Sequence, residues 1–125
     1  MKIAFASKQN LYIDEHFGWC ERFFVYEVNN DSFSFVCEID SSLKYEDEAE
    51  KLLYKIECID GCDIVYVLQI GPKAANMVQN AGIFPLKSSI QTHSIQEALQ
   101  KIQELINENP PLWLKRILLK TQGDE

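Results

Sequence analysis

A nearly unbroken apolar run, DIVYVLQI at Asp63 to Ile70, constrains the fold of this chain most. Such a run is typical of a strand that is covered on both faces, so helices are needed on both sides of its sheet. Gly71-Pro72 follows, and proline suits the first position of a helix. A helical period precedes the run at Tyr45 to Ile59, and Gly61 suits the position after that helix. The chain is therefore expected to alternate strands and helices.

Shorter strand-like runs surround this segment. Three of them precede the first predicted helix, at Lys2 to Ser7, Arg22 to Val28 and Phe33 to Ile39. Turn-forming residues at 29–32 join the last two runs into a hairpin. The alternation of the third run predicts that one of its faces presents Phe33, Phe35, Cys37 and Ile39.

One more strand and two more helices complete the predicted elements. Ile83 to Leu86 is expected to be an edge strand, because Pro85 cannot donate a backbone hydrogen bond to a neighbouring strand. Ser94 and Glu97 form a capping-box pattern at the start of an amphipathic helix. A short terminal helix is expected at residues 112–118, after a proline break.

The element order is thus βββαβαβα with one more short helix. Crossovers between parallel strands are right-handed, so the two later strands should run parallel to the first. This order predicts an α/β fold of the ribonuclease H-like type in three layers, with a mixed five-stranded sheet of order 3-2-1-4-5 and helices on both faces. We expect a single domain over residues 1–120 and a disordered tail at residues 121–125.

Composition and charge exclude several classes of function. The net charge of −7 disfavours binding to nucleic acid, because an acidic protein repels the phosphate backbone. No apolar run reaches the roughly 18 residues of a membrane helix, and the first one is too short for a signal peptide, so we expect a cytoplasmic protein. Four cysteines in such a chain indicate free thiols or metal ligands rather than disulfides.

The motifs of common enzymes are also missing from the sequence. There is no Ser-His-Asp order, phosphate-binding loop or dinucleotide-binding glycine pattern. A nuclease on this fold would need carboxylates at the ends of the central strands to hold metal ions. The first strand has none, and Asp63 lies at the entrance of the fourth. We therefore expect a binding protein rather than an enzyme.

The chemistry of the sequence is concentrated in the loop from Tyr12 to Tyr26. His16 is either a metal ligand or a residue that hydrogen-bonds a neighbouring carbonyl and fixes the turn before Gly18. Cys20, four residues further on, is either a second ligand at an iron centre or a small buried apolar residue. Both interpretations of each residue stay open at this point.

The predicted strand order places this loop beside Gly71, at the carboxyl edge of the sheet. The helix amides after Gly71, together with Lys73, can hold an anion, although the same residues also simply begin a helix. Cys58 and Cys62 are spaced CxxxC, which is a weak signal for a metal site. His93 precedes the serine cap and is expected to be exposed.

Several segments resemble the dinitrogenase iron-molybdenum cofactor biosynthesis family, and within it the NifX-like proteins. The resemblance extends over nearly the whole chain and depends on the order and spacing of its motifs. The tail NPPLWL resembles the tail of the NifX group. The matching segments are Met1 to Ala6, His16 to Gly18, Phe23 to Val28, Lys55-Ile56, Gly61 to Val67, Ile70 to Ala75, Ala81 to Pro85 and Asn109 to Leu114.

The resemblance implies a ribonuclease H-like fold without nuclease activity. It also implies a small carrier that binds an iron-sulfur precursor of the iron-molybdenum cofactor. The carrier would pass this cargo between the radical enzyme that builds the cluster, the scaffold that matures it and dinitrogenase. His16 becomes the leading ligand candidate, with Gly18, Gly71 and Lys73 around the cargo. Small residues commonly follow His-Phe-Gly in this family, whereas Trp19-Cys20 here indicates either an added thiolate ligand or altered cargo.

Two other functions stay open beside the carrier. One is a non-metal interaction or regulatory domain that docks to nitrogenase assembly proteins through residues 112–118. The other is a thiol redox protein that uses Cys58 and Cys62. We expect a monomer or a weak homodimer, without a nucleic-acid or membrane partner.

Overall fold

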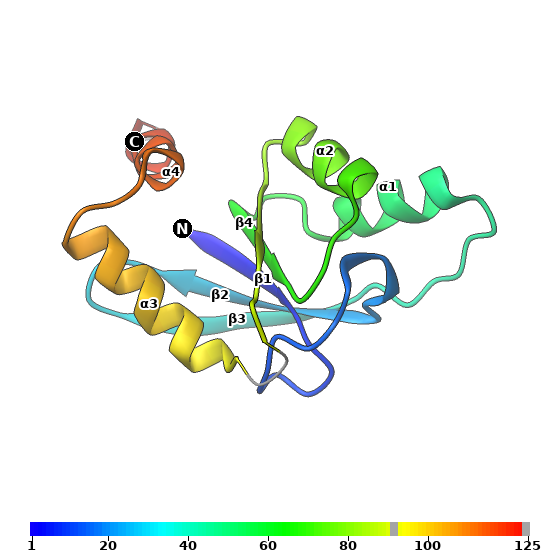
Figure 1. The fold of residues 1–125 in the computed structure, drawn as a ribbon, viewed down its shortest axis with the longest axis horizontal. Coiled ribbons are helices and arrows are strands. Elements are labelled where there is room, and N and C mark those ends of the chain that lie inside the picture. The colour runs from blue at the N-terminus through cyan, green and yellow to red at the C-terminus, as the bar shows by residue number, and fades with distance from the viewer. Residues whose placement is uncertain (91–92, 124–125) are drawn as a thin grey trace.

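The computed structural model describes residues 1–90 and 93–123. Its five strands form one mixed sheet of order β3-β2-β1-β4-β5, as predicted (Figure 1). Strand β1 pairs antiparallel with β2 and parallel with β4, and β4 pairs parallel with the edge strand β5. The strands are β1 (Lys2–Ala6), β2 (Arg22–Val28), β3 (Phe33–Asp40), β4 (Ile64–Val67) and β5 (Phe84–Lys87).

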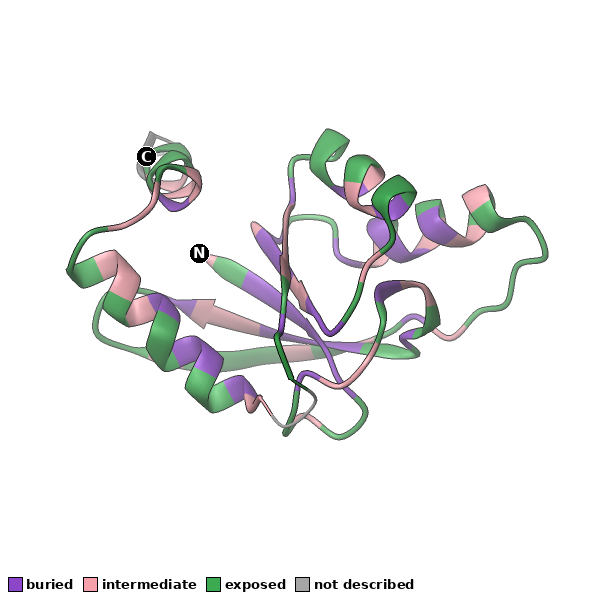
Figure 2. Ribbon diagram, viewed as in Figure 1, coloured by how far each residue is buried: buried purple, intermediate pink, exposed green. Residues whose placement is uncertain are grey.

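Four helices cover the two faces of this sheet, which confirms the predicted α/β layers. They are α1 (Glu48–Cys58), α2 (Pro72–Asn80), α3 (Ile95–Asn107) and α4 (Leu112–Gly123). Helices α1 and α2 pack on one core, and α3 packs on the other. Buried residues lie mainly on the central strands and on the inner sides of these helices (Figure 2). In the described residues, no helix combines the length and the apolar character that crossing a membrane requires.

Strand β3 differs from its predicted alternation because it contains a bulge. Val25 pairs with Cys37, but Tyr26 pairs with Phe35, so Val36 is left without a partner residue. One extra residue reverses the face of every side chain beyond it. Cys37 and Ile39 therefore pack on the core under α1 and α2, whereas Phe33 packs on the core under α3. The expectation of a single shared face was wrong.

The first helix begins later than its apolar period suggested. Asp47 caps α1, and its carboxylate accepts a hydrogen bond of 2.9 Å from the backbone N–H of Glu50. Glu48 and Glu50 lie in the first turn, where acidic side chains interact favourably with the helix dipole. Leu53, an apolar residue within the predicted helical period at Tyr45 to Ile59, is 52% exposed. After α1, Gly61 has a φ of +90°, as its predicted position requires.

The C-terminal helices begin as predicted and extend further. Ser94 caps α3 by accepting a hydrogen bond of 3.0 Å from the N–H of Glu97, but the Glu97 carboxylate accepts from the serine hydroxyl and not from an amide. Helix α4 continues to Gly123, because no helix-breaking residue follows position 118 until that glycine. Residues 121–123 of the expected tail are thus helical, and residues 124–125 lie outside the described residues.

Candidate functional site

The loop that follows β1 lies directly beside the segment that follows β4. The N–H of Leu68 donates to the carbonyl of Glu15, and the N–H of Phe17 donates to the carbonyl of Gln69, both at 2.9 Å. These bonds make an isolated parallel bridge between His16 and Gln69. The predicted neighbourhood of the two loops is confirmed. Strand β4 is shorter than predicted because its last residues pair with this loop instead of with β1.

A short 3-10 turn, η1 (Phe17–Trp19), sets the directions of the side chains in this loop. Side chains three residues apart eclipse one another in a 3-10 helix. His16 and Trp19 are accordingly both exposed, whereas Phe17 and Cys20 are both fully buried. We call the exposed pair the outer side of η1 and the buried pair its inner side.

The outer side of η1 faces a pocket of about 760 Å³. This His16 pocket lies between the turn, the start of α1, the segment after β4 and the loop after β5. Its size is in the range of pockets that hold small ligands. Its lining comprises His16, Gly18, Trp19, Glu48, Lys51, Leu52, Leu68, Gln69, Ile70, Gly71, Ala74, Ser89 and Ile90.

Lys51 supplies the positive charge of the His16 pocket, and sequence reasoning missed it. Its Nζ atom lies 2.9 Å from a carboxylate oxygen of Glu48 and 5.7 Å from the centroid of the Trp19 ring. A Cβ atom added at Gly18 would lie 3.7 Å from the same Nζ atom, which is ordinary contact. The one signal in the sequence that could have indicated Lys51 was its three-residue spacing from Glu48, next to the apolar Leu52. Two side chains three residues apart in a helix lie on one face.

The other predicted cargo-binding residues are divided between the pocket and the surface around it. Gly71 lines the pocket and is the N-cap residue of α2. Lys73 lies two residues further on, is exposed and is not among the lining residues. The pocket therefore brings together His16, Gly18 and Gly71 but not Lys73.

Cys20 lies on the inner side of η1 and does not line the His16 pocket. Its thiol donates to the carbonyl of Arg22 at 2.7 Å. Burial raises the pKa of this thiol to about 12, so it is protonated at neutral pH. A metal ligand must be the thiolate, and burial disfavours that form here more than the nearby charge of Lys55 favours it. The geometry supports the interpretation of Cys20 as a buried apolar residue, and its role as a ligand stays a prediction.

The remaining cysteines are free thiols as well. Cys62 is buried, and burial raises its pKa to about 11. Cys58 is half-buried, with its sulfur 3.8 Å from the carbonyl oxygen of Asp40. Among the described residues, no group of three His, Cys, Asp or Glu side chains is placed to hold a metal ion. A cargo bound here would have few protein ligands.

A buried lysine of α1 holds the inner side of η1 in place. Lys55 is only 4% exposed, and its Nζ atom donates to the carbonyls of Cys20 at 2.5 Å and of Ser41 at 2.9 Å. The Ser41 hydroxyl also donates to the Cys20 carbonyl at 2.8 Å. Three separate segments, the exit of η1, the end of β3 and α1, are thereby joined. Nothing in the local sequence around Lys55 indicated this role.

His93 is half-buried, and the expectation that it would be exposed was wrong. Its Nδ1 atom lies 3.1 Å from the hydroxyl of Ser88, and its ring meets the Tyr66 ring edge-on with centroids 5.9 Å apart. These contacts hold the loop that brings Ser89 and Ile90 to the pocket. His93 itself is not among the lining residues.

The sequence matches the family described as dinitrogenase iron-molybdenum cofactor over residues 1–105. The chain belongs to this family. It is similar to the protein NifX of Herbaspirillum seropedicae, with 36% identity over 98% of this chain and 84% of that protein. It is similar to NifX of Azotobacter vinelandii, with 30% identity over 100% and 79% of the two chains. The resemblance to NifX-like proteins is thus confirmed, and membership supports a role in biosynthesis of the iron-molybdenum cofactor.

More distant likenesses extend to a longer relative and to a solved structure. The protein NifY of Azotobacter vinelandii is 26% identical over 94% of this chain, which spans 48% of that protein. The crystal structure of PH0822 superimposes with a TM-score of 0.63 at 16% identity, covering 83% of this chain and 91% of the other. At that identity the likeness shows the fold alone. It does not test the ribonuclease H-like label, which stays a prediction.

Proposed function

We propose that the protein carries an iron-sulfur precursor of the iron-molybdenum cofactor and passes it between cofactor-assembly proteins. The observation on which this proposal depends is the exposed imidazole of His16 in the His16 pocket. A neutral imidazole is a common ligand of iron. We expect the protein to bind and release this cargo without catalysing a reaction.

The electrostatics of the pocket suit such a cargo. Clusters of iron and sulfide with thiolate or sulfide ligands carry net negative charge. Lys51 and the amide end of α2 behind Gly71 both favour an anion, although Glu48 reduces the charge of the lysine. Because the overall net charge is −7, this positive feature is local and is not part of a basic surface.

The small number of ligating side chains also suits a carrier. Among the described residues that line the His16 pocket, one is a histidine and none is a cysteine. A cluster held by one protein ligand can be transferred when a partner supplies a second. A closed site with four protein ligands would hold the cluster too firmly for transfer.

Anaerobic loading tests the proposal. The apo protein is mixed with an iron-sulfur precursor, desalted, and its retained iron is quantified. We expect His16→Ala to weaken retention roughly tenfold or more, because even second-shell changes at metal sites cost about that much. Cys20→Ala should retain the cargo like the wild type. His93→Gln is the matched control, because it removes the other histidine. Equal retention by wild type and His16→Ala would rule out the ligand assignment.

A non-metal interaction or regulatory domain is the second candidate function. Helix α4 favours it, because Leu112 and Leu119 are 63% and 69% exposed while Leu114 is buried. On this hypothesis, the apo protein binds nitrogenase cofactor-assembly proteins, such as the cluster-building radical enzyme, the scaffold or dinitrogenase. Partner binding by an apo protein that takes up no iron under anaerobic conditions would favour this function over the carrier.

A further inference from the structure

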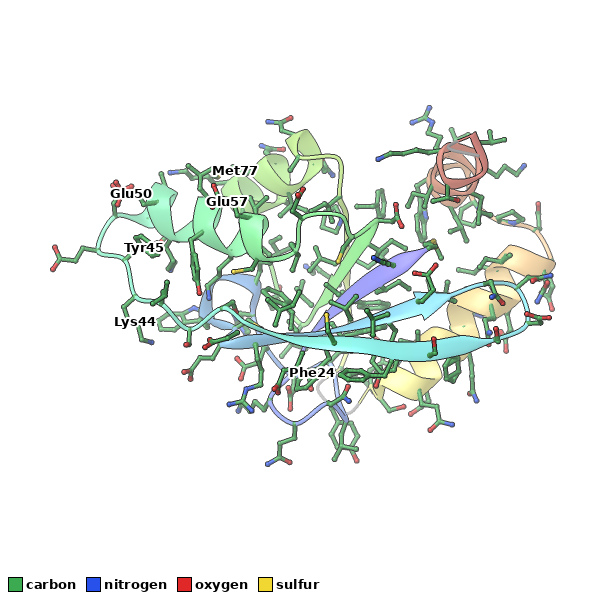
Figure 3. All side chains as sticks on the ribbon, turned by 180° about the vertical axis from the view of Figure 1, so that it is seen from behind. Phe24, Lys44, Tyr45, Glu50, Glu57 and Met77 are labelled. Carbon is green, nitrogen blue, oxygen red and sulfur yellow. The ribbon has the colours of Figure 1, made fainter. Side chains whose placement is uncertain are left out.

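A second, smaller pocket adjoins the His16 pocket, and we call it the lysine pocket. Its volume is about 150 Å³, and it shares Gly18, Trp19 and Lys51 with the larger pocket. Lys44 and Tyr45 are among its lining residues. Both lie on the segment that leads into α1 (Figure 3). The full lining is Gly18, Trp19, Glu21, Ser41, Ser42, Leu43, Lys44, Tyr45, Lys51 and Lys55.

The base of the lysine pocket contains a buried positive charge without a carboxylate partner. Lys55 is 4% exposed, and both of its hydrogen-bond acceptors are neutral backbone carbonyls. Among the described residues, no ion pair includes Lys55. An ammonium group has three N–H donors, so two carbonyls leave one donor for another acceptor. Burying a charge without a counter-ion is costly, and an anion beside it would reduce that cost.

Two more lysines surround the same space. Burial is the main cause that lowers the pKa of Lys55, the Cys20 and Cys58 side chains partly offset it, and the positive charges of Lys51 and Lys44 lower it by a smaller amount. Lys51 is the better compensated of the two neighbours, because Glu48 lies 2.9 Å away. Repulsion among like charges at one pocket is relieved when an anion binds between them.

The lining also defines what the anion can be. Three lysines and one acidic residue, Glu21, line the pocket, and Glu48 outside the lining pairs with Lys51. The hydroxyls of Ser42 and Tyr45 add possible hydrogen-bond donors. A volume of about 150 Å³ corresponds to roughly five water molecules. This space is large enough for a small oxyanion.

We propose that the lysine pocket binds a small oxyanion, either phosphate or the carboxylate groups of a small organic acid. Lys55 holds it from below, and Lys44 and Lys51 hold it from the sides. The proposal concerns the apo protein and does not depend on the iron-sulfur cargo. Because Lys51 and Trp19 line both pockets, an anion bound here lies next to the cargo.

Calorimetric titration of the apo protein, residues 1–125, tests this proposal. Inorganic phosphate and citrate are titrated separately at constant ionic strength, with sodium chloride as the reference. We expect saturable binding of at least one of them at one site. Loss of a charged hydrogen-bond donor should weaken that binding roughly tenfold in Lys51→Ala and about threefold in the more exposed Lys44→Ala. Lys73→Ala removes an exposed lysine outside the pocket and should bind like the wild type.

Fluorescence of Trp19, which lines both pockets, reports binding independently of the calorimetric signal, and the Lys44→Ala variant separates the two pockets. In a Trp113→Phe background, Trp19 is the one remaining tryptophan, and phenylalanine keeps the stacking on Phe84. We expect the bound anion to change Trp19 emission with the same affinity as the heat signal. Absence of saturable binding by both anions would overturn the proposal. Weakening by Lys51→Ala alone, with Lys44→Ala unchanged, would place the anion in the His16 pocket and would also overturn it.

Discussion

The outer and inner sides of the turn η1 are adjacent in sequence and opposite in character. Phe17 and Cys20, on the inner side, have no exposed surface, and the backbone carbonyl of Cys20 accepts hydrogen bonds from Lys55 and Ser41. On the outer side, Trp19 is 76% exposed and His16 lies in the pocket. The comparison teaches that the fold depends on one side of this turn, so the other side is free to bind a ligand.

Removal of the buried ring should have the largest effect on stability. Phe17 packs against Phe23 with ring centroids 5.9 Å apart, so Phe17→Ala leaves a cavity in the core. We expect a loss of about 3–5 kcal/mol in the free energy of unfolding. Trp19→Ala, on the outer side, should cost no more than about 0.5 kcal/mol. Urea unfolding followed by circular dichroism measures both, and similar losses would remove the distinction between the two sides.

The anchoring lysine should come next. Lys55→Met keeps the apolar stem but leaves the Ser41 carbonyl without its buried donor and the Cys20 carbonyl with one donor fewer. We expect a loss of about 1–3 kcal/mol in the free energy of unfolding. Lys51 lies one turn earlier in α1 and lines the His16 pocket. Lys51→Met is the matched control, and we expect it to change the free energy of unfolding very little. A larger loss in the control than in Lys55→Met would show that the anchor was misassigned.

The protonation of Cys20 gives a smaller effect that depends on pH. The pKa of the folded thiol is raised to about 12 from an ordinary value of 9.0, so the unfolded chain releases this proton first. The resulting stability is complete below pH 9 and is lost as pH rises towards 12. Relative to Cys20→Ala, the wild type should lose about 1 kcal/mol of unfolding free energy by about pH 10.

The lowered pKa of Lys55 changes stability with pH in the opposite direction. Its folded form binds fewer protons than the unfolded chain just below the ordinary pKa of 10.5, so stability rises with pH there. Cys20→Ala also removes the influence of the Cys20 side chain on the pKa of Lys55. Urea titrations of both proteins at matched pH values therefore report Cys20 together with its effect on Lys55. A constant difference between wild type and Cys20→Ala from about pH 8 to about pH 10 would contradict the buried, protonated thiol.

Thiol labelling makes the same comparison without changing a residue, and so has the smallest effect on the fold. Cys20 and Cys62 are buried with raised pKa values, whereas Cys37 and Cys58 are half-buried. We expect iodoacetamide to modify Cys37 or Cys58 first in the native protein, with Cys20 and Cys62 reacting only after denaturation. Peptide mass spectrometry identifies the sites. Early modification of both Cys58 and Cys62 would instead support the thiol redox hypothesis.

Much of the fold could be predicted from the sequence because its patterns are local. The apolar run at β4, the glycines after α1 and α2, and the serine cap of α3 each indicate an element without tertiary information. The bulge at Val36 could not be predicted in this way. It changes the face of β3 through pairing with β2, and the sequence of β3 alternates as if no bulge were present.

The site was only partly predictable for a related reason. His16 and Gly71 could be placed together, since the strand order brings the two loops to one edge of the sheet. Lys51 and Ile90 come from a helix and a loop whose approach depends on how the layers pack, and no local pattern specifies that. The burial of Cys20 follows from its three-residue spacing from Phe17 in a 3-10 turn, which the sequence does not distinguish from an irregular loop.

The central claim is that His16, on the outer side of η1, is the residue that binds the cargo. The two histidines of this chain make a direct measurement possible, because His93 is held by Ser88 away from the pocket lining. Protein labelled with ¹⁵N-histidine is observed by NMR while an iron-sulfur precursor is added anaerobically, with His16→Ala giving the assignment. We predict that the His16 ring signals shift or broaden while those of His93 stay unchanged. Retained cargo with unchanged His16 signals would contradict the account.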